Sequence, residues 1–307
     1  MKNLLKFIAL DKRCAFLVFI VAQLFFISFS ALGDRSKVDL TGYKVVWRDE
    51  FDGDKVDTTK WGSPQQKRQG SSLWHKRNVS VKDGAAVLKI RKTQDPTYRY
   101  ESACLRTTKS YAKADRLFEF VYGYVEVRCK LPKYVRSDYW FAAWMMIGNV
   151  NNNTNTREGC EVDIMETFRV YDRGSIPHTF HWGGYGVSHN VAGYTATPNL
   201  DLLDGNWHTF GCLWEKEGMT FTIDGYVTWS TKLQGLGREG KNKHKSQGVP
   251  QVSGYIKLSV EAASWVGPNS DWEKVMPEED EVLIDWVRVW QRDVVTRSRR
   301  SVSCFHA

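Results

Sequence analysis

The 307-residue sequence lacks several features that would indicate other classes of protein. It has no internal repeat, no amphipathic helix of credible length and no cysteine spacing typical of a metal site. Cysteine is scarce, because only five remain after residue 33, and an odd number leaves disulfide pairing unspecified. Cys104, Cys129 and Cys212 lie in strand-like segments, where they fit buried, small apolar residues. The length allows one large domain or two small ones.

The chain also lacks a large net charge once the two ends are set aside. The net charge is +8, but residues 1–33 and the Arg-rich end at 292–307 each contribute +3. Only +2 is left for residues 34–291, so a nucleic-acid-binding function has little support. We expect the basic end to be a solvated, disordered tail.

Residues 1–33 have the composition of a secretory signal. Basic residues precede an apolar stretch from Cys14 to Phe29, and the small-residue run Ser30–Gly33 follows it. The stretch is slightly short for a transmembrane helix, so we expect cleavage near Gly33 rather than an uncleaved anchor. The sequence therefore predicts a secreted, periplasmic or cell-surface protein without stable membrane insertion after cleavage.

Short segments of strand composition fill residues 34–291, and Asp-Gly pairs typical of hairpin turns lie between several of them. Many short strands with regular turns favour an all-β sandwich or jelly roll. We see no linker within this range, so we expect one domain. The expected strands are Tyr43–Trp47, Ala86–Arg91, Gly123–Leu131, Tyr139–Met146, Glu161–Glu166, His208–Trp214, Thr220–Ile223, Tyr255–Val260 and Val282–Trp290.

Tryptophan is abundant. Thirteen tryptophans exceed what a core of this size needs, because each buried indole N–H must find a partner. Side chains alternate between the faces of a strand, so Trp140, Ala142, Trp144 and Met146 share one face. Two interpretations are open at this point: a surface of flat rings for sugar binding, or plain aromatic packing in a β-sheet core.

Three acidic residues lie within six consecutive positions, from Glu161 to Glu166. In a regular strand Glu161 and Asp163 lie on one face, whereas Glu166 would point into the apolar face with Val162 and Ile164. A lone carboxylate buried there is very costly. One β-bulge between Asp163 and Glu166 returns Glu166 to the acidic face.

Three carboxyl groups on one face cannot all ionise at neutral pH, so at least one pKa must rise. A retaining glycosidase needs this division between an ionised nucleophile and a protonated acid, with carboxyl groups about 5–5.5 Å apart. Glu161 and Glu166 can meet that distance across a bulged strand, and Asp163 between them can hydrogen-bond the nucleophile. A solvent-facing acidic strand and a calcium site are the alternatives.

The motif Glu-Val-Asp-Ile-Met-Glu at 161–166 resembles the active-site signature of glycoside hydrolase family 16 in its bulged form. Further blocks resemble the same family, in the same order, over about residues 43–291, which is far stronger than one motif alone. One departure is Phe141, which stands where proline is usual. The blocks are Trp47–Phe51, Arg77–Val79 with Asp83-Gly84, Tyr122–Arg128 with Leu131-Pro132, Trp140–Met145, His181–Gly184, Trp207–Thr209, Asp224-Gly225 and Ile284–Val289.

The resemblance implies a concanavalin A-like β-jelly roll, in which two curved antiparallel sheets form an open substrate cleft. It implies an endo-acting O-glycosyl hydrolase that retains the anomeric configuration by double displacement. Glu161 would be the nucleophile, Asp163 its helper and Glu166 the acid/base. The implied substrate contacts are Trp140 and Trp144, which would stack on sugar rings, and Asn78 and His181 on opposite sides of the cleavage point; His181 also fits a structural histidine.

The resemblance implies no cofactor for catalysis, although many members of the family bind one structural calcium on the convex face. The matching positions are Glu50, Gly84 through its backbone, and Asp285, which offer the oxygen ligands that calcium prefers. We expect a monomer that binds a polysaccharide and no nucleic acid.

The substrate expected from the sequence is a β-1,3-glucan, because tryptophan dominates the expected cleft and the body of the chain is nearly neutral. The alternative is an endo-β-galactanase acting on agar, porphyran or carrageenan, because sulfate groups require fixed arginine or lysine side chains. Arg157, Arg169, Arg173 and the stretch Arg238–Lys245 would support the anionic alternative if they reached the cleft. A transglycosylase or a catalytically weak carbohydrate-binding protein on the same fold is a further alternative.

Overall fold

The computed structural model describes residues 36–68, 72–131, 139–148, 160–168, 174–182, 185, 189–231, 250–262 and 278–293. The expected signal at 1–33, the basic tail beyond residue 293, Arg157, Arg169, Arg173 and Arg238–Lys245 lie outside the described residues. The strands all belong to one unit of the chain, which begins at Lys37. Within the described residues, no helix is long and apolar enough to cross a membrane.

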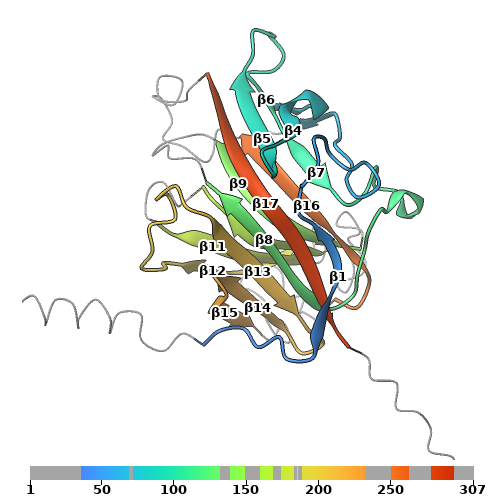
Figure 1. Cartoon of the computed structure of the whole chain (residues 1–307), viewed down its shortest axis with the longest axis vertical. Coiled ribbons are helices and arrows are strands. Elements are labelled where there is room, and N and C mark those ends of the chain that lie inside the picture. The colour runs from blue at the N-terminus through green and yellow to red at the C-terminus, as the bar shows by residue number, and fades with distance from the viewer. Residues whose placement is uncertain are drawn as a thin grey trace, which may run out of the picture. The chain divides into compact units, whose positions relative to one another are not determined.

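The strands of the described residues form two sheets, one of eleven strands and one of six (Figure 1). The larger sheet runs β15-β14-β13-β8-β17-β5-β6-β3-β2, with β1 paired to β17 and β4 paired to β5; the smaller runs β12-β11-β10-β9-β16-β7. The larger sheet contains β1 (Tyr43–Asp49), β2 (Gln66–Arg68), β3 (Ser72–Trp74), β4 (Val79–Lys82), β5 (Ala85–Lys92), β6 (Tyr100–Ser102), β8 (Gly123–Lys130), β13 (His208–Trp214), β14 (Met219–Ile223), β15 (Tyr226–Thr231) and β17 (Glu279–Arg292). The smaller sheet contains β7 (Cys104–Arg106), β9 (Tyr139–Ile147), β10 (Cys160–Glu166), β11 (Ile176–Trp182), β12 (Asn190–Ala196) and β16 (Gly254–Ala262), and two short 3-10 helices, η1 (Lys76–Asn78) and η2 (Lys113–Asp115), lie between strands.

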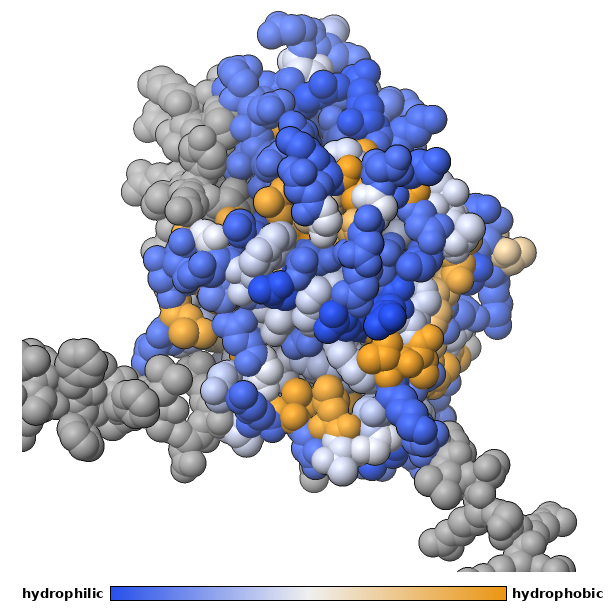
Figure 2. Space-filling view, in the orientation of Figure 1, coloured by the Kyte–Doolittle hydropathy of each residue, from blue (hydrophilic) through white to orange (hydrophobic). Residues whose placement is uncertain are grey.

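Every strand expected from the sequence coincides with an observed strand, so the all-β, jelly-roll prediction is confirmed. The pairings are antiparallel except for the short pair β3 and β6. Strand β17 is longer than expected, because one of its edges pairs with β8 while the other pairs first with β5 and then with β1. The side of the molecule seen in Figure 2 is largely hydrophilic, with separate apolar patches, and Val45 and Val46 of β1 are among the exposed apolar residues.

Strand β9 is buried on both faces, and its two faces belong to different apolar clusters. Phe141, Ala143 and Met145 join the main core, to which both sheets contribute. Trp140, Ala142, Trp144 and Met146 form a separate cluster with Tyr255 of β16, so the shared face predicted from the alternation is confirmed. Cys104, Cys129, Cys160 and Cys212 are buried, and none of them forms a disulfide within the described residues. The smaller sheet therefore turns one face to the core and presents an aromatic floor on the other.

Candidate active site

Strand β10 lies beside β9 and carries the three acidic residues. The register between the two strands shifts between Asp163 and Met165, which makes Ile164 the extra residue of a β-bulge. The predicted bulge is confirmed, and Glu166 returns to the face that carries Glu161 and Asp163. The paired positions are Glu161 with Met146, Asp163 with Trp144, Met165 with Ala143 and Glu166 with Ala142.

The carboxyl groups of Asp163 and Glu166 are held in surroundings that disfavour ionisation. Asp163 is only 2% exposed, and burial together with the charge of Glu161 raises its pKa well above the usual range. Burial and the charge of Asp163 likewise raise the pKa of Glu166, and these outweigh a hydrogen bond from Trp140 Nε1 to Glu166 Oε1 at 2.9 Å. Glu166 is therefore suited to the role of a protonated acid beside an ionised carboxylate.

His181 lies directly beside the three acidic residues of β10. It stands opposite Glu161 in the pairing of β10 with β11, and its Nε2 is 3.2 Å from Asp163 Oδ2. Burial lowers the pKa of His181, against the charges of Glu161 and Glu166. Ligand-type atoms of Glu161, Asp163 and His181 lie within 4.8 Å of one another, a spacing that would also suit a metal ion.

Two residues that were not selected from the sequence complete this side of the site. The hydroxyl of Tyr185 donates a hydrogen bond to Glu161 Oε1, and Nε2 of His189 lies 2.9 Å from Nδ1 of His181. Both follow β11 in the connection to β12, where no periodic pattern fixes the direction of a side chain. The tyrosine and two histidines within nine positions after Phe180 were the available signal.

Lys257 of β16 is a third residue that sequence reasoning missed. It pairs with Trp144 across β9 and β16, and its ammonium nitrogen lies 3.1 Å from the centroid of the Trp144 ring. The side chain is buried, and within the described part of the chain it forms no ion pair. The alternation of polar and apolar residues from Tyr255 to Glu261 was the signal that could have found it.

The predicted sugar-binding residues do not all lie beside the carboxylates. Trp140 and Trp144 lie on the floor beside the carboxylates, and among the described residues the buried Nε1 of Trp144 has no hydrogen-bond partner. Asn78 is buried in η1, and its amide donates to the carbonyl oxygen of Ser102 at 3.1 Å. Direct contacts of these residues with sugar stay predictions.

The strand pairing brings the three positions expected to bind calcium near one another. Strand β17 pairs with β5 as far as Ile284 and with β1 from Val287, so Glu50, Gly84 and Asp285 all lie near the junction of these strands.

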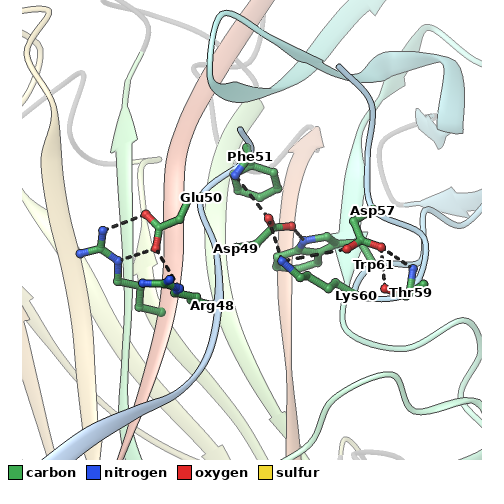
Figure 3. A network of polar contacts seen from close by, with 9 residues as sticks. Arg48, Asp49, Glu50, Phe51, Asp57, Thr59, Lys60 and Trp61 are labelled. Atoms are coloured by element: carbon green, nitrogen blue, oxygen red, sulfur yellow. Dashed lines mark hydrogen bonds and ion pairs between the residues drawn. The ribbon is translucent and has the colours of Figure 1, made fainter. Parts of the chain in front are cut away.

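The two carboxylates at this junction, however, already have arginine partners. Glu50 accepts two hydrogen bonds from Arg288, at 2.9 and 2.8 Å, and Asp285 binds Arg128. Figure 3 shows Glu50 turned away from Asp49, which contacts Trp61 and Lys60 on the other side of the chain. These residues do not offer an unpaired set of oxygen ligands, so they fit calcium poorly, and calcium binding stays a prediction.

Comparison with known proteins places this arrangement in a family. Residues 46–292 match the family model described as beta-porphyranase A–D, GH16 domain. The chain is 28% identical over 217 residues to glucan endo-1,3-beta-glucosidase A1 of Niallia circulans, and the match covers 64% of this chain but only 30% of that longer protein. It is 25% identical over 265 residues to beta-porphyranase E of Zobellia galactanivorans, with 78% of this chain and 84% of that protein covered. A solved non-specific endo-beta-1,3(4)-glucanase of family GH16 superposes with a TM-score of 0.62 at 25% identity, covering 84% of this chain and 94% of the other.

Proposed function

Because this chain belongs to glycoside hydrolase family 16, we propose that it hydrolyses internal β-linkages of a polysaccharide with retention of anomeric configuration. The observation that carries the proposal is the bulged strand β10, which sets Glu161, Asp163 and Glu166 on one face. A carboxyl group with a raised pKa beside a carboxylate that accepts a hydrogen bond is the division of roles that double displacement requires.

In the proposed first step the carboxylate of Glu161 attacks the anomeric carbon, and the bond to the leaving oxygen breaks. The protonated carboxyl of Glu166 donates its proton to that oxygen, so the shorter chain leaves as a neutral alcohol. In the second step Glu166, now ionised, removes a proton from water, and the water oxygen displaces Glu161 from the anomeric carbon. Two inversions give net retention.

Asp163 and Trp140 support the two catalytic residues in this scheme. The raised pKa of Asp163 favours a protonated carboxyl beside Glu161, and its buried Oδ1 has no hydrogen-bond partner within the described residues, so that proton can stabilise the Glu161 carboxylate when it is released as a leaving group. The hydrogen bond from Trp140 fixes one oxygen of Glu166 and thereby orients the other toward the substrate.

Two substrate classes are proposed, and they differ in charge. A β-1,3-glucan is supported by the aromatic floor of Trp140 and Trp144 and by the similarity to an endo-1,3-glucosidase. A galactan of the porphyran type is supported by the family model and by the similarity to a porphyranase.

The proposal is tested by measuring reducing ends released from laminarin, mixed-linkage glucan, agarose, porphyran and κ-carrageenan at low and high salt. Activity on laminarin with little salt dependence supports the glucan, since stacking is not screened as charge is. Activity confined to a sulfated galactan, falling as salt rises, supports the second class. NMR of the first product should show the retained anomer, and the inverted anomer would refute the mechanism. Sugar products longer than the substrate would identify transglycosylation instead of hydrolysis.

A further inference from the structure

Tyr185 differs from the other residues around the carboxylates, because about half of it is exposed to solvent while its hydroxyl forms a hydrogen bond within the protein. The side chain is 50% exposed, yet its hydroxyl donates to Glu161 Oε1 instead of pointing into water. The contact joins the connection between β11 and β12 to strand β10, so it depends on the fold and not on neighbouring sequence positions. An exposed ring ordered in this way needs a second source of support.

That support is a stack of three rings. The Tyr185 ring stacks on His189, with centroids 5.0 Å apart and planes 29° apart, and His189 stacks on His181 at 5.2 Å and 10°. His181 Nδ1 and His189 Nε2 share a hydrogen bond of 2.9 Å, and the other nitrogen of His181 contacts Asp163. One cluster of rings therefore contacts the nucleophile at one end and its helper carboxyl at the other.

The chemistry at Glu161 makes a hydrogen-bond donor valuable. Glu161 must be ionised to attack, although it lies against Asp163 and on the same face as Glu166. A donor that keeps its own proton favours the ionised form and fixes which oxygen is left to react. Burial, followed by the charge of Glu161, raises the pKa of Tyr185 above its usual range, so the hydroxyl stays a donor wherever the enzyme works.

We infer that Tyr185 is a positioning residue for the nucleophile: its hydroxyl holds one oxygen of the Glu161 carboxylate and leaves the other to attack, and the stack on His189 and His181 keeps the hydroxyl in place. This role rests on the proposed function, since it presupposes that Glu161 attacks the sugar. Among the described residues, the titratable and charged groups that face this point are Glu161, Asp163 and Glu166 of β10, His181 of β11, His189 before β12, and Lys257 of β16.

The variant Tyr185→Phe isolates the hydroxyl, because phenylalanine keeps the ring and its stack on His189. Tyr194→Phe is the matched control: Tyr194 of β12 is 46% exposed and stacks on Trp229 at 6.4 Å. A residue that only packed, or only stacked on sugar, would tolerate the loss of its hydroxyl.

The first measurement is kcat and KM, on whichever polysaccharide the unmutated protein cleaves, in buffer containing a chelator. For Tyr185→Phe we expect kcat to fall by about tenfold with KM nearly unchanged, because one hydrogen bond to a charged group is lost. Tyr194→Phe should behave as the unmutated protein. Equal kcat values for Tyr185→Phe and the control would overturn the inference.

The second measurement needs no activity. Tyrosine labelled with carbon-13 at Cζ reports ionisation of each ring by NMR, and the Tyr185 signal is the one missing from Tyr185→Phe. We expect this signal to show no titration up to about pH 11 in the unmutated protein, and to titrate at lower pH in Glu161→Gln. Titration near the ordinary value of about 10 in both proteins would overturn the contact. If no polysaccharide is cleaved, the proposed function fails, while this measurement still decides whether Tyr185 binds Glu161.

Discussion

Carboxylates in two regions of the molecule meet opposite surroundings. On the larger sheet and beside it, Glu50 binds Arg288, and Glu101 of β6 binds Arg77 and Arg91. Arg288 lowers the pKa of Glu50; burial would raise that of Glu101, but its two arginines outweigh burial and lower it.

On β10, by contrast, neither Asp163 nor Glu166 forms an ion pair with arginine or lysine among the described residues, and burial raises the pKa of both, against the charge of Lys257 at Asp163. The same type of side chain is thus kept charged in one region and protonated in the other by what it touches. Only the second arrangement supplies an acid at neutral pH, and it does so at a cost in stability.

The largest expected effect separates the two regions by activity. Glu166→Gln should lower kcat by about 10²–10⁴-fold, because the leaving oxygen loses its proton donor. Glu161→Gln should lose at least as much, because no covalent intermediate can form. Glu50→Gln, which makes the same chemical change beside Arg288, should retain activity. Reducing-end assays on purified, folded variants decide this, and full activity of Glu161→Gln would refute the assignment of the nucleophile.

The next effect concerns a histidine behind the bulge. His178 of β11 is buried, with Nδ1 2.7 Å from the carbonyl oxygen of Ile164, and burial lowers its pKa to about 4. A depressed pKa contributes stability that is present above the unfolded value of about 6.5 and is lost as pH falls toward 4. The unmutated protein should therefore lose up to about 3 kcal/mol more than His178→Gln between these pH values. Urea unfolding of both proteins across this pH range tests the prediction, and equal losses in the free energy of unfolding would contradict it.

The residue pattern within a strand predicted much of this contrast, whereas the contacts between strands could not be predicted from the sequence. The positions of Glu161, Asp163 and Glu166 in the alternation along the strand predicted the bulge, because an unpaired carboxylate on the core face is too costly. The partners Arg288 and Arg77 could not be predicted, since they come from strands far apart in the sequence. Tyr185 lies in a connection without periodicity, so its direction depended on the fold.

A smaller effect has opposite signs in the two regions. At pH 7, Glu101→Gln should lower the free energy of unfolding by about 1–2 kcal/mol, because two partly exposed arginines lose their shared carboxylate. Glu166→Gln should raise it by about 1–2 kcal/mol. The raised pKa of Glu166 means that its contribution is favourable below about pH 4.5 and is lost as pH rises, whereas glutamine does not ionise. Chemical unfolding at pH 7 measures both, and a destabilised Glu166→Gln would contradict the contrast.

The smallest expected effect concerns calcium, for which Glu50 and Asp285 already hold arginines. A cation that competes with Arg288 and Arg128 binds weakly, so added calcium should raise the melting temperature of the unmutated protein only slightly, and a chelator should reverse the rise. Arg288→Gln frees the Glu50 carboxylate, so calcium should stabilise this variant more than the unmutated protein. Thermal unfolding with calcium and with chelator, in both proteins, measures the difference. If neither protein responds, no calcium site exists at this junction, and the arginines alone neutralise its carboxylates.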